Sequence, residues 1–311
     1  MNLSISSFEK GFFRYFWLSV AVCFVGFFGA SELLIRYLVE PQDILDAHVR
    51  YVKNQKSPYI LLGDSLSMYA FQGHEEWAKL YFESENPIHL DVKFRLYRDR
   101  VRVEKVIIGL SISYLERYDP RVEEVEKKYE MLFKDEGVSG LRVFQTRHWN
   151  FLKPYWRAFL ERGTLESNRR LDSNSGEVAF RAEIDESLWE DRNKASLAAK
   201  SAKYWLSDAD VVQSRQLKTL TQFVLRLVRA NVDLCLVVPP LSPEFLREAN
   251  KYTAFHDLNE YWLDLADKAN SKFFDFNKHP LIVGTEFLDP IHVMPTGSSK
   301  LFEKALKGCE F

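Results

Sequence analysis

The sequence predicts an α/β protein with a mainly parallel sheet and helices on both faces. Its 311 residues are 46% hydrophobic, which is enough to bury a full core. Four short apolar runs have the length and composition of buried strands, and they cover residues 59–62, 103–108, 232–238 and 272–276. Helix-like periodic stretches separate the later runs. Strands that alternate with helices in this way indicate a parallel sheet.

The first two runs each end in a glycine, Gly63 after YILL and Gly109 after VEKVII. A glycine in this place is typical of a buried strand that leads into a tight turn. A periodic stretch over 211–230 precedes the third run, VDLCLVV, which two prolines close, and a second one over 252–270 precedes the fourth, KFFDF. Apolar residues at helical spacing over 298–306 predict a final helix that closes the domain.

The segment 15–31 carries no charged residue and lies between Arg14 and Glu32. A transmembrane helix needs about 20 mainly apolar residues, which this segment reaches if both charges lie at the interfaces. Lys10 and Arg14 precede it, so the positive-inside rule predicts a cytoplasmic N-terminus and an extracytoplasmic domain, periplasmic or extracellular. A cleaved signal peptide and a buried soluble helix are the alternatives. The absence of an A-x-A site and the apolar continuation LLIRYLV favour a membrane anchor.

The expected organisation has three parts. They are a cytoplasmic N-terminus and transmembrane anchor over 1–40, a polar stem over 41–57, and a folded domain over 58–311. An insertion over about 113–214 interrupts the domain, because this charged and aromatic stretch is too long for a simple connection between two strands.

The composition disfavours several classes of protein. Lysine and arginine total 42 against 44 acidic residues, a formal net charge of −2, so no nucleic-acid partner is expected. The seven histidines include no HExxH pair and the cysteines match no zinc or redox spacing, so no metal or cofactor is expected. Cys23 lies in the apolar N-terminal segment and Cys235 in a predicted buried strand. These positions favour small apolar fillers over a disulfide for all three cysteines, Cys309 included.

Ser65 follows the first predicted strand, in the motif GDSL. In an open α/β sheet, ligands bind outside the carboxyl ends of the strands, so this serine is placed where a reactive group is expected. Gly63 permits a sharp turn, and the backbone N–H groups that open the next helix point toward a negative oxygen beside the serine. A motif of four residues is not specific on its own.

Asp289 and His292 stand three residues apart in FLDPIHVMP, just before the last predicted helix. A serine hydroxyl becomes a good nucleophile when an imidazole takes its proton and a carboxylate holds the other imidazole nitrogen. On its own, this pair is better explained by a turn capped by Asp289 with a partly exposed histidine. Together with Ser65, in this order and each after a predicted strand, the pair favours a catalytic triad.

The two motifs together resemble those of the SGNH hydrolase superfamily, also called GDSL esterases. YILLGDSLSM is similar to its nucleophile block, LDPIHVMPTGSSKLFEKAL to its terminal D-x-x-H block and closing helix, and LVVPPLSPEFL to the strand and loop before that block. The resemblance covers 58–306 in outline, without the insertion. It implies a three-layer α/β/α, flavodoxin-like fold in which Ser65 is the nucleophile, His292 the general base and Asp289 its orienting partner.

The resemblance also implies an oxyanion hole built from the Ser65 backbone N–H, a glycine and an asparagine. The sequence departs from the family there, because LSIS follows VEKVIIG where the family has G-x-N-D. Gly109 and Ser111 stand at a suitable strand end, and Asn86 precedes another predicted strand, so these residues are the candidates. Loss of one such donor lowers the rate by about a hundredfold or more. Either another group replaces the asparagine or the activity is low.

Three functions remain open. The first is an O-acyltransferase that moves an acetyl or similar group onto an envelope polysaccharide or other glycopolymer. Membrane-anchored SGNH-like proteins of bacterial envelopes often have this role, beside a polytopic membrane acyltransferase. The second is an esterase or lipase that uses water, and the third is a non-catalytic envelope binding or assembly protein. The anchor favours the first and the complete triad disfavours the third. Trp149 and Trp156 of the insertion can line an acceptor groove, although core packing or lipid contact also explains them.

Overall fold

The structure was obtained as a computed structural model. It describes residues 5–34, 48, 51–82, 85–115, 125, 129, 169–171, 178–180, 191–280 and 285–311. The chain divides into two compact units, one of Met1–Ala47 with Glu136–Ser167 and one of His48–Asp135 with Asn168–Phe311. Most of the expected stem and insertion lies outside the described residues, and so do Trp149 and Trp156.

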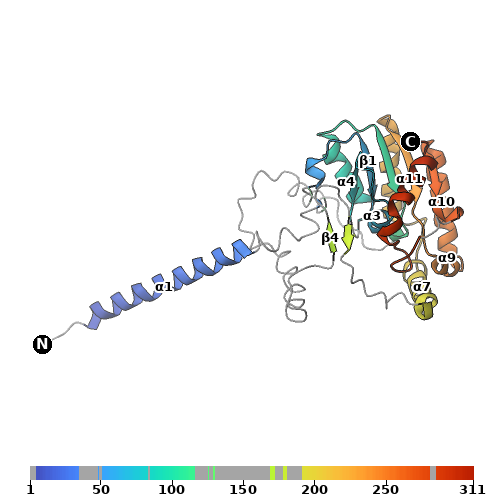
Figure 1. Cartoon of the computed structure of the whole chain (residues 1–311). Helices are drawn as coiled ribbons and strands as arrows, with labels where there is room; N and C mark the ends of the chain where they lie inside the picture. The colour runs from blue at the N-terminus through green and yellow to red at the C-terminus, as the bar shows by residue number, and fades with distance from the viewer. Residues whose placement is uncertain are drawn as a thin grey trace. The chain divides into compact units, whose positions relative to one another are not determined.

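The first unit contains α1, Ile5–Leu34 (Figure 1). Among the described residues, α1 is the one helix long and apolar enough to cross a membrane, over the 19 residues Tyr15–Leu33. Large apolar side chains along this span, such as Trp17 and Phe24, are exposed. A continuous exposed apolar surface is unfavourable in water and suits a lipid environment. These properties agree with the predicted anchor, and a signal sequence would share them.

The second unit contains a parallel sheet of five strands in the order β2-β1-β3-β6-β7. The strands are β1 (Tyr59–Gly63), β2 (Trp77–Tyr81), β3 (Lys105–Gly109), β6 (Asp233–Val238) and β7 (Lys272–Asp275). All four strands predicted from the apolar runs are present. The strand order is that of flavodoxin-like folds, so the predicted fold class is confirmed.

β2 and the helix after it differ from the prediction. The strand was not expected because Lys79 interrupts the apolar residues of WAKLY, yet Lys79 is fully buried in the structure. The residues after Asn86 form α4 (Pro87–Arg98) and not a strand. The Asn86 side chain accepts a hydrogen bond from the backbone N–H of Ile88 (3.1 Å), and Pro87 occupies the first helical position. An Asn-Pro pair of this kind is a helix start signal, which the alternating pattern of IHLDVKF conceals.

Helices cover both faces of the sheet (Figure 1). The helices of this unit are α3 (Ser65–Ala70), α4, α7 (Asp191–Leu206), α8 (Arg215–Arg229), α9 (Pro243–Ala249), α10 (Thr253–Ala269) and α11 (Ser298–Gly308). α4, α8 and α10 share one apolar core with alternate strand residues, among them Leu234 and Leu236 of β6. α3 and α11 pack together on the other face, where the rings of Phe71 and Phe302 lie 5.8 Å apart. Because both faces are buried, the strands are mainly apolar, and Lys79 of β2 is a buried exception.

The shorter elements connect these layers. They are η3 (Ile112–Leu115), η6 (Phe276–Lys278) and η7 (Pro295–Gly297), together with an antiparallel pair formed by β4 (Arg169–Leu171) and β5 (Val178–Phe180). η3 follows β3 directly and η7 leads into α11, so both lie next to elements that carry candidate site residues.

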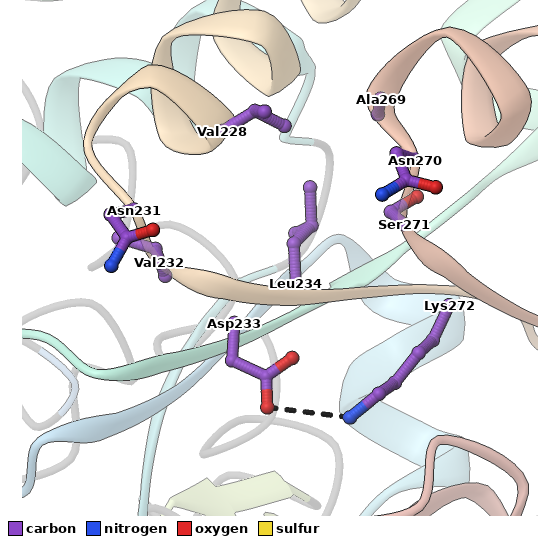
Figure 2. A pocket seen from close by; sticks show the side chains of 9 residues that line it. All are labelled: Val228, Asn231, Val232, Asp233, Leu234, Ala269, Asn270, Ser271 and Lys272. Atoms are coloured by element: carbon purple, nitrogen blue, oxygen red, sulfur yellow. Dashed lines mark hydrogen bonds and ion pairs between the residues drawn. The ribbon is translucent and has the colours of Figure 1, made fainter.

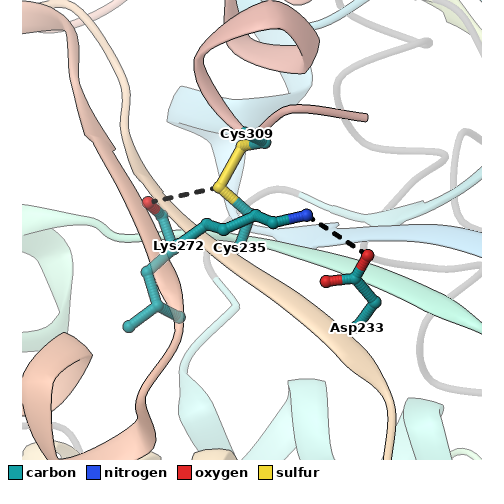
Figure 3. The surroundings of a disulfide bond; sticks show 5 residues. Asp233, Cys235, Lys272 and Cys309 are labelled. Carbon is teal, nitrogen blue, oxygen red and sulfur yellow. Dashed lines mark hydrogen bonds and ion pairs between the residues drawn. A yellow bond between two sulfur atoms is a disulfide. The ribbon is translucent and has the colours of Figure 1, made fainter.

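Cys235 and Cys309 form a disulfide with their Cα atoms 5.8 Å apart, beside the ion pair of Lys272 and Asp233 (Figure 3). The expectation that the cysteines are only apolar fillers is therefore wrong for these two. Strand alternation turns Cys235 away from the face of Leu234 and toward α11, whose C-terminal cap is Cys309. The two cysteines are 74 positions apart, so no local spacing predicts the bond. Cys23 of α1 is free.

Replacing Cys309 by alanine should lower the free energy of unfolding by about 2–4 kcal/mol, because the disulfide closes a long loop in the unfolded chain. Chemical unfolding of the full chain in detergent measures this loss, with Cys23→Ala as the control that leaves the disulfide intact. Peptide mapping without reductant should recover Cys235 joined to Cys309. Two free thiols in protein from its native compartment would contradict the bond.

Gly63 and Gly109 end adjacent strands, and Ser67 of α3 lies against both. A Cβ on Gly63 would stand 2.2 Å from the Ser67 hydroxyl oxygen and 2.4 Å from the Ser67 Cβ. A Cβ on Gly109 would stand 1.8 Å and 3.0 Å from the same two atoms. The backbone of Gly63 is not in the left-handed region, so a sharp turn does not explain this glycine. It is required instead because α3 approaches so closely that a side chain would meet Ser67.

Three alanine substitutions test this packing. Gly109→Ala should destabilise the fold by about 1–3 kcal/mol, since it overpacks the contact with Ser67. Ser67→Ala should recover most of that loss because the Gly109 clash is mainly with the hydroxyl, which is buried without a hydrogen-bond partner among the described residues. Gly63→Ala should not be recovered, since the Ser67 Cβ remains in the way. Equal recovery in the two double-mutant cycles would contradict this account.

Candidate active site

The loop that carries Asp289 and His292 is a tight hairpin before α11. Phe287 and Val293 pair across it as an isolated antiparallel bridge. The backbone N–H of Leu288 donates to the carbonyl of His292 (2.8 Å). These bonds fix the backbone on both sides of the two candidate residues, so their side chains project from a defined turn.

Ser65, His292 and Asp289 form a continuous hydrogen-bonded chain. Ser65 Oγ lies 2.9 Å from His292 Nε2, and His292 Nδ1 lies 2.7 Å from Asp289 Oδ2. Ser65 is the first residue of α3 and stands 227 positions before His292. The structure thus brings together the three residues that the two sequence motifs select, at the carboxyl end of β1.

Asp289 uses its two oxygens for different purposes. Oδ1 accepts hydrogen bonds from the backbone N–H groups of Ile291 and His292, both at 2.9 Å, while Oδ2 faces the imidazole. Burial raises the pKa of Asp289. The hydrogen bond to His292, the charge of that ring and the two backbone donors lower it, and together they outweigh burial, so the pKa lies below its usual value. The carboxylate is therefore ionised at neutral pH. It caps the turn with one oxygen and at the same time orients the histidine with the other.

The tautomer of His292 follows from its partners. An ionised Asp289 can only accept, so Nδ1 carries the hydrogen, and in the neutral ring Nε2 then offers its lone pair to the Ser65 hydroxyl. The buried ring of Tyr69 packs edge-on against the imidazole, with the ring centroids 5.0 Å apart. The histidine is therefore oriented to take a proton from Ser65.

Asp64 lies between the end of β1 and Ser65 and is 1% exposed. Its Oδ1 accepts from the backbone N–H of Leu66 (3.0 Å), which caps α3, and its Oδ2 accepts from the hydroxyls of Ser111 and Ser113, both at 2.5 Å. Burial raises the pKa of Asp64, and the two serine hydrogen bonds and the charge of His292 partly oppose this. Sequence reasoning missed this contact because it depends on β1 and β3 being neighbours.

The candidate oxyanion-hole residues have other contacts. The Ser111 hydroxyl donates to Asp64, and the Asn86 side chain caps α4. The carbonyl of Gly109 accepts from the Tyr114 hydroxyl (2.9 Å). The backbone N–H of Ser65 lies at the start of α3, on the same residue as the reacting hydroxyl.

A pocket among the described residues lies away from Ser65. Figure 2 shows it between the ends of α8 and α10 and the beginnings of β6 and β7. Its lining residues are Val228, Asn231, Val232, Asp233, Leu234, Ala269, Asn270, Ser271 and Lys272. The amino ends of parallel strands lie at the sheet edge opposite to the carboxyl ends, so this pocket is not part of the candidate active site.

Fold and site together define a parallel α/β protein with a hydrogen-bonded Ser-His-Asp arrangement. No family model matches the chain, and no curated protein sequence matches it. A solved structure provisionally described as a platelet activating factor from Streptococcus pneumonia is similar, with 12% identity and a TM-score of 0.40, over 89% of this chain and 96% of that chain. At that TM-score the likeness supports no conclusion about activity. The assignment of the site depends on its own geometry.

Asp289→Asn separates the two purposes of this side chain. The amide oxygen can still accept from the two backbone donors, but the amide nitrogen cannot accept from His292 Nδ1. The variant should therefore stay folded and lose on the order of 10⁴-fold in kcat for an ester such as nitrophenyl acetate. Asp289→Ala should lose the same activity and also about 1 kcal/mol of stability, because the turn is no longer capped. Wild-type turnover by Asp289→Asn would exclude the arrangement as catalytic.

Proposed function

We propose that this protein is a serine-dependent acyl-ester enzyme of the SGNH type, acting as an extracytoplasmic O-acyltransferase. Its acceptor would be an envelope polysaccharide or other glycopolymer, and its cargo an acetyl or similar group. The observation that carries the proposal is the hydrogen-bonded chain of Ser65, His292 and Asp289 at the carboxyl end of a parallel strand. The resemblance of the two sequence motifs to the SGNH superfamily supports it.

In the first half of the reaction, Ser65 Oγ attacks the carbonyl carbon of the acyl ester while His292 Nε2 takes the hydroxyl proton. Asp289 stabilises the imidazolium that forms. The backbone N–H of Ser65 donates to the oxyanion of the tetrahedral intermediate. The bond to the leaving alcohol then breaks, His292 returns the proton to that alcohol, and an acyl-Ser65 ester remains.

In the second half, an acceptor hydroxyl gives its proton to His292 Nε2 and attacks the acyl-Ser65 carbonyl. The bond to Ser65 Oγ breaks and the serine regains a proton from the imidazolium. A sugar hydroxyl as acceptor gives transfer, and water gives hydrolysis. The triad serves both reactions equally, so the acceptor site decides between them.

The envelope location is supported by two features. α1 has the length and composition of a membrane span, and a disulfide such as Cys235–Cys309 persists in oxidising compartments outside the cytoplasm. An anchored extracytoplasmic domain would meet both a membrane-bound acyl donor and nascent glycopolymer. A polytopic membrane acyltransferase is the proposed source of the acyl group.

An esterase is the second candidate, favoured by the 19% exposure of the His292 side chain, which lets water reach the base. A non-catalytic envelope protein is the third candidate. The intact hydrogen bonds of Ser65 and Asp289 argue against it, because a binding role needs no oriented imidazole.

Hydrolysis of nitrophenyl acetate should be slow, and an added envelope glycan should increase the rate of acyl release by accepting the group. Trp149→Ala or Trp156→Ala should reduce this glycan-dependent transfer more than the simple hydrolysis, since we propose that the insertion forms part of the acceptor site. Leu263→Ala is the control, because this exposed apolar side chain belongs to α10, outside the insertion.

Fast hydrolysis that no envelope glycan diverts would indicate the esterase instead, above all if deletion of the protein leaves glycan acylation unchanged. Mass analysis of the acylated product and of the envelope polymers distinguishes the two reactions.

A further inference from the structure

We propose that Ser111 and Ser113 are positioning residues for the nucleophile. Their hydroxyls hold the carboxylate of Asp64, and Asp64 holds the first turn of α3, on which Ser65 lies. This proposal rests on the proposed function, because it takes Ser65 as the nucleophile.

The serine hydroxyls form a closed set of contacts with Asp64. Both lie 2.5 Å from the same oxygen, Oδ2, and 2.8 Å from each other. The backbone N–H of Ser113 also donates to the Ser111 hydroxyl (3.1 Å). Ser111 and Asp64 are fully buried, so the orientation of each group is fixed by its partners. Since β1 and β3 are neighbouring strands, these bonds join the two strand ends beside Ser65.

Helix capping alone does not explain a carboxylate at position 64. Capping uses only Oδ1, which accepts from Leu66, and an asparagine would cap the helix as well. Removing a carboxylate from water is unfavourable, and burial here raises the pKa of Asp64 in spite of the two serine hydrogen bonds. A carboxyl group buried beside a reacting serine in spite of its desolvation is a common property of functional sites.

The groups around Asp64 fit this role. His292 faces Asp64 as well, and the charge of its ring is the next cause, after the two serine hydrogen bonds, that lowers the pKa of Asp64. Tyr114 also lies nearby, and its pKa is raised well above the usual value by burial and then by the charges of Asp64 and Glu85, so the phenol stays neutral. Ser111 occupies the place where the family motif has its asparagine. In this chain the Ser111 hydroxyl donates to Asp64, so the residue at this position has a positioning role in place of the asparagine's role as an oxyanion donor.

Ser113→Ala and Ser111→Ala test the proposal with nitrophenyl acetate as the substrate. Each variant should lose about tenfold or more in kcat with KM nearly unchanged, because a misplaced nucleophile affects the reaction and not ground-state binding. Ser113→Thr keeps the hydroxyl and should restore kcat. Thr221→Val is the matched control, since it removes a half-buried hydroxyl of α8 that bonds the Tyr261 hydroxyl of α10 (2.5 Å), and it should leave kcat unchanged.

The pH profile gives a second readout. Loss of either serine hydrogen bond raises the pKa of Asp64, so the acid limb of the kcat profile should move to higher pH in Ser113→Ala. Wild type should gain stability relative to Asp64→Asn as the pH falls through the raised pKa of Asp64, because the folded state then holds a proton on Asp64 more tightly than the unfolded state does. The same variant should lose kcat.

The outcomes separate this proposal from the proposed function. Wild-type turnover that survives Ser65→Ala would overturn both. Turnover that depends on Ser65, together with unchanged kcat in folded Ser111→Ala and Ser113→Ala, would overturn the positioning role alone. If Ser111→Ala does not fold, the kcat values of Ser113→Ala and Asp64→Asn test the positioning role instead. A stable Asp64→Asn variant with wild-type kcat and an unshifted acid limb in Ser113→Ala would exclude the role.

Discussion

The position of Ser65 depends on the close packing of α3 against the ends of β1 and β3. Ser67 lies between Gly63 and Gly109, and a side chain at either position would push the helix away from the sheet. Asp64 acts from the same turn, because it caps α3 and binds the hydroxyls of the loop after β3. Two interactions of α3 with the strand ends therefore place the candidate nucleophile. They are the packing of Ser67 on the two glycines and the hydrogen bonds of Asp64.

His292 meets Ser65 because the last part of the chain is attached to the same sheet. The hairpin of Asp289 and His292 leads through η7 into α11, which packs on α3. The disulfide of Cys235 and Cys309 then joins the end of α11 to β6. Each group of the candidate site stands on the sheet or on an element bonded to it. Such rigid support reduces the entropic cost of bringing the reacting groups together.

Local signals predicted much of this arrangement. The apolar runs marked four strands, and the order of Ser65 before the D-x-x-H pair selected the residues that the structure places in contact. Features that depend on distant neighbours were missed. Lys79 concealed β2 because its burial needs tertiary partners, and the Cys235–Cys309 disulfide and the bonds of Asp64 need the strand order. Asn86 had a local signal, its following proline, which the alternating pattern outweighed.

The central claim is that His292 and Asp289 activate Ser65 as a nucleophile. A fluorophosphonate reacts with an activated serine and leaves an adduct that peptide mass spectrometry can locate. We expect one adduct, on Ser65, in the wild-type protein, with no adduct in Ser65→Ala and labelling slowed by orders of magnitude in His292→Ala. An unlabelled Ser65 in the folded wild-type protein, or equal labelling in His292→Ala, would contradict it.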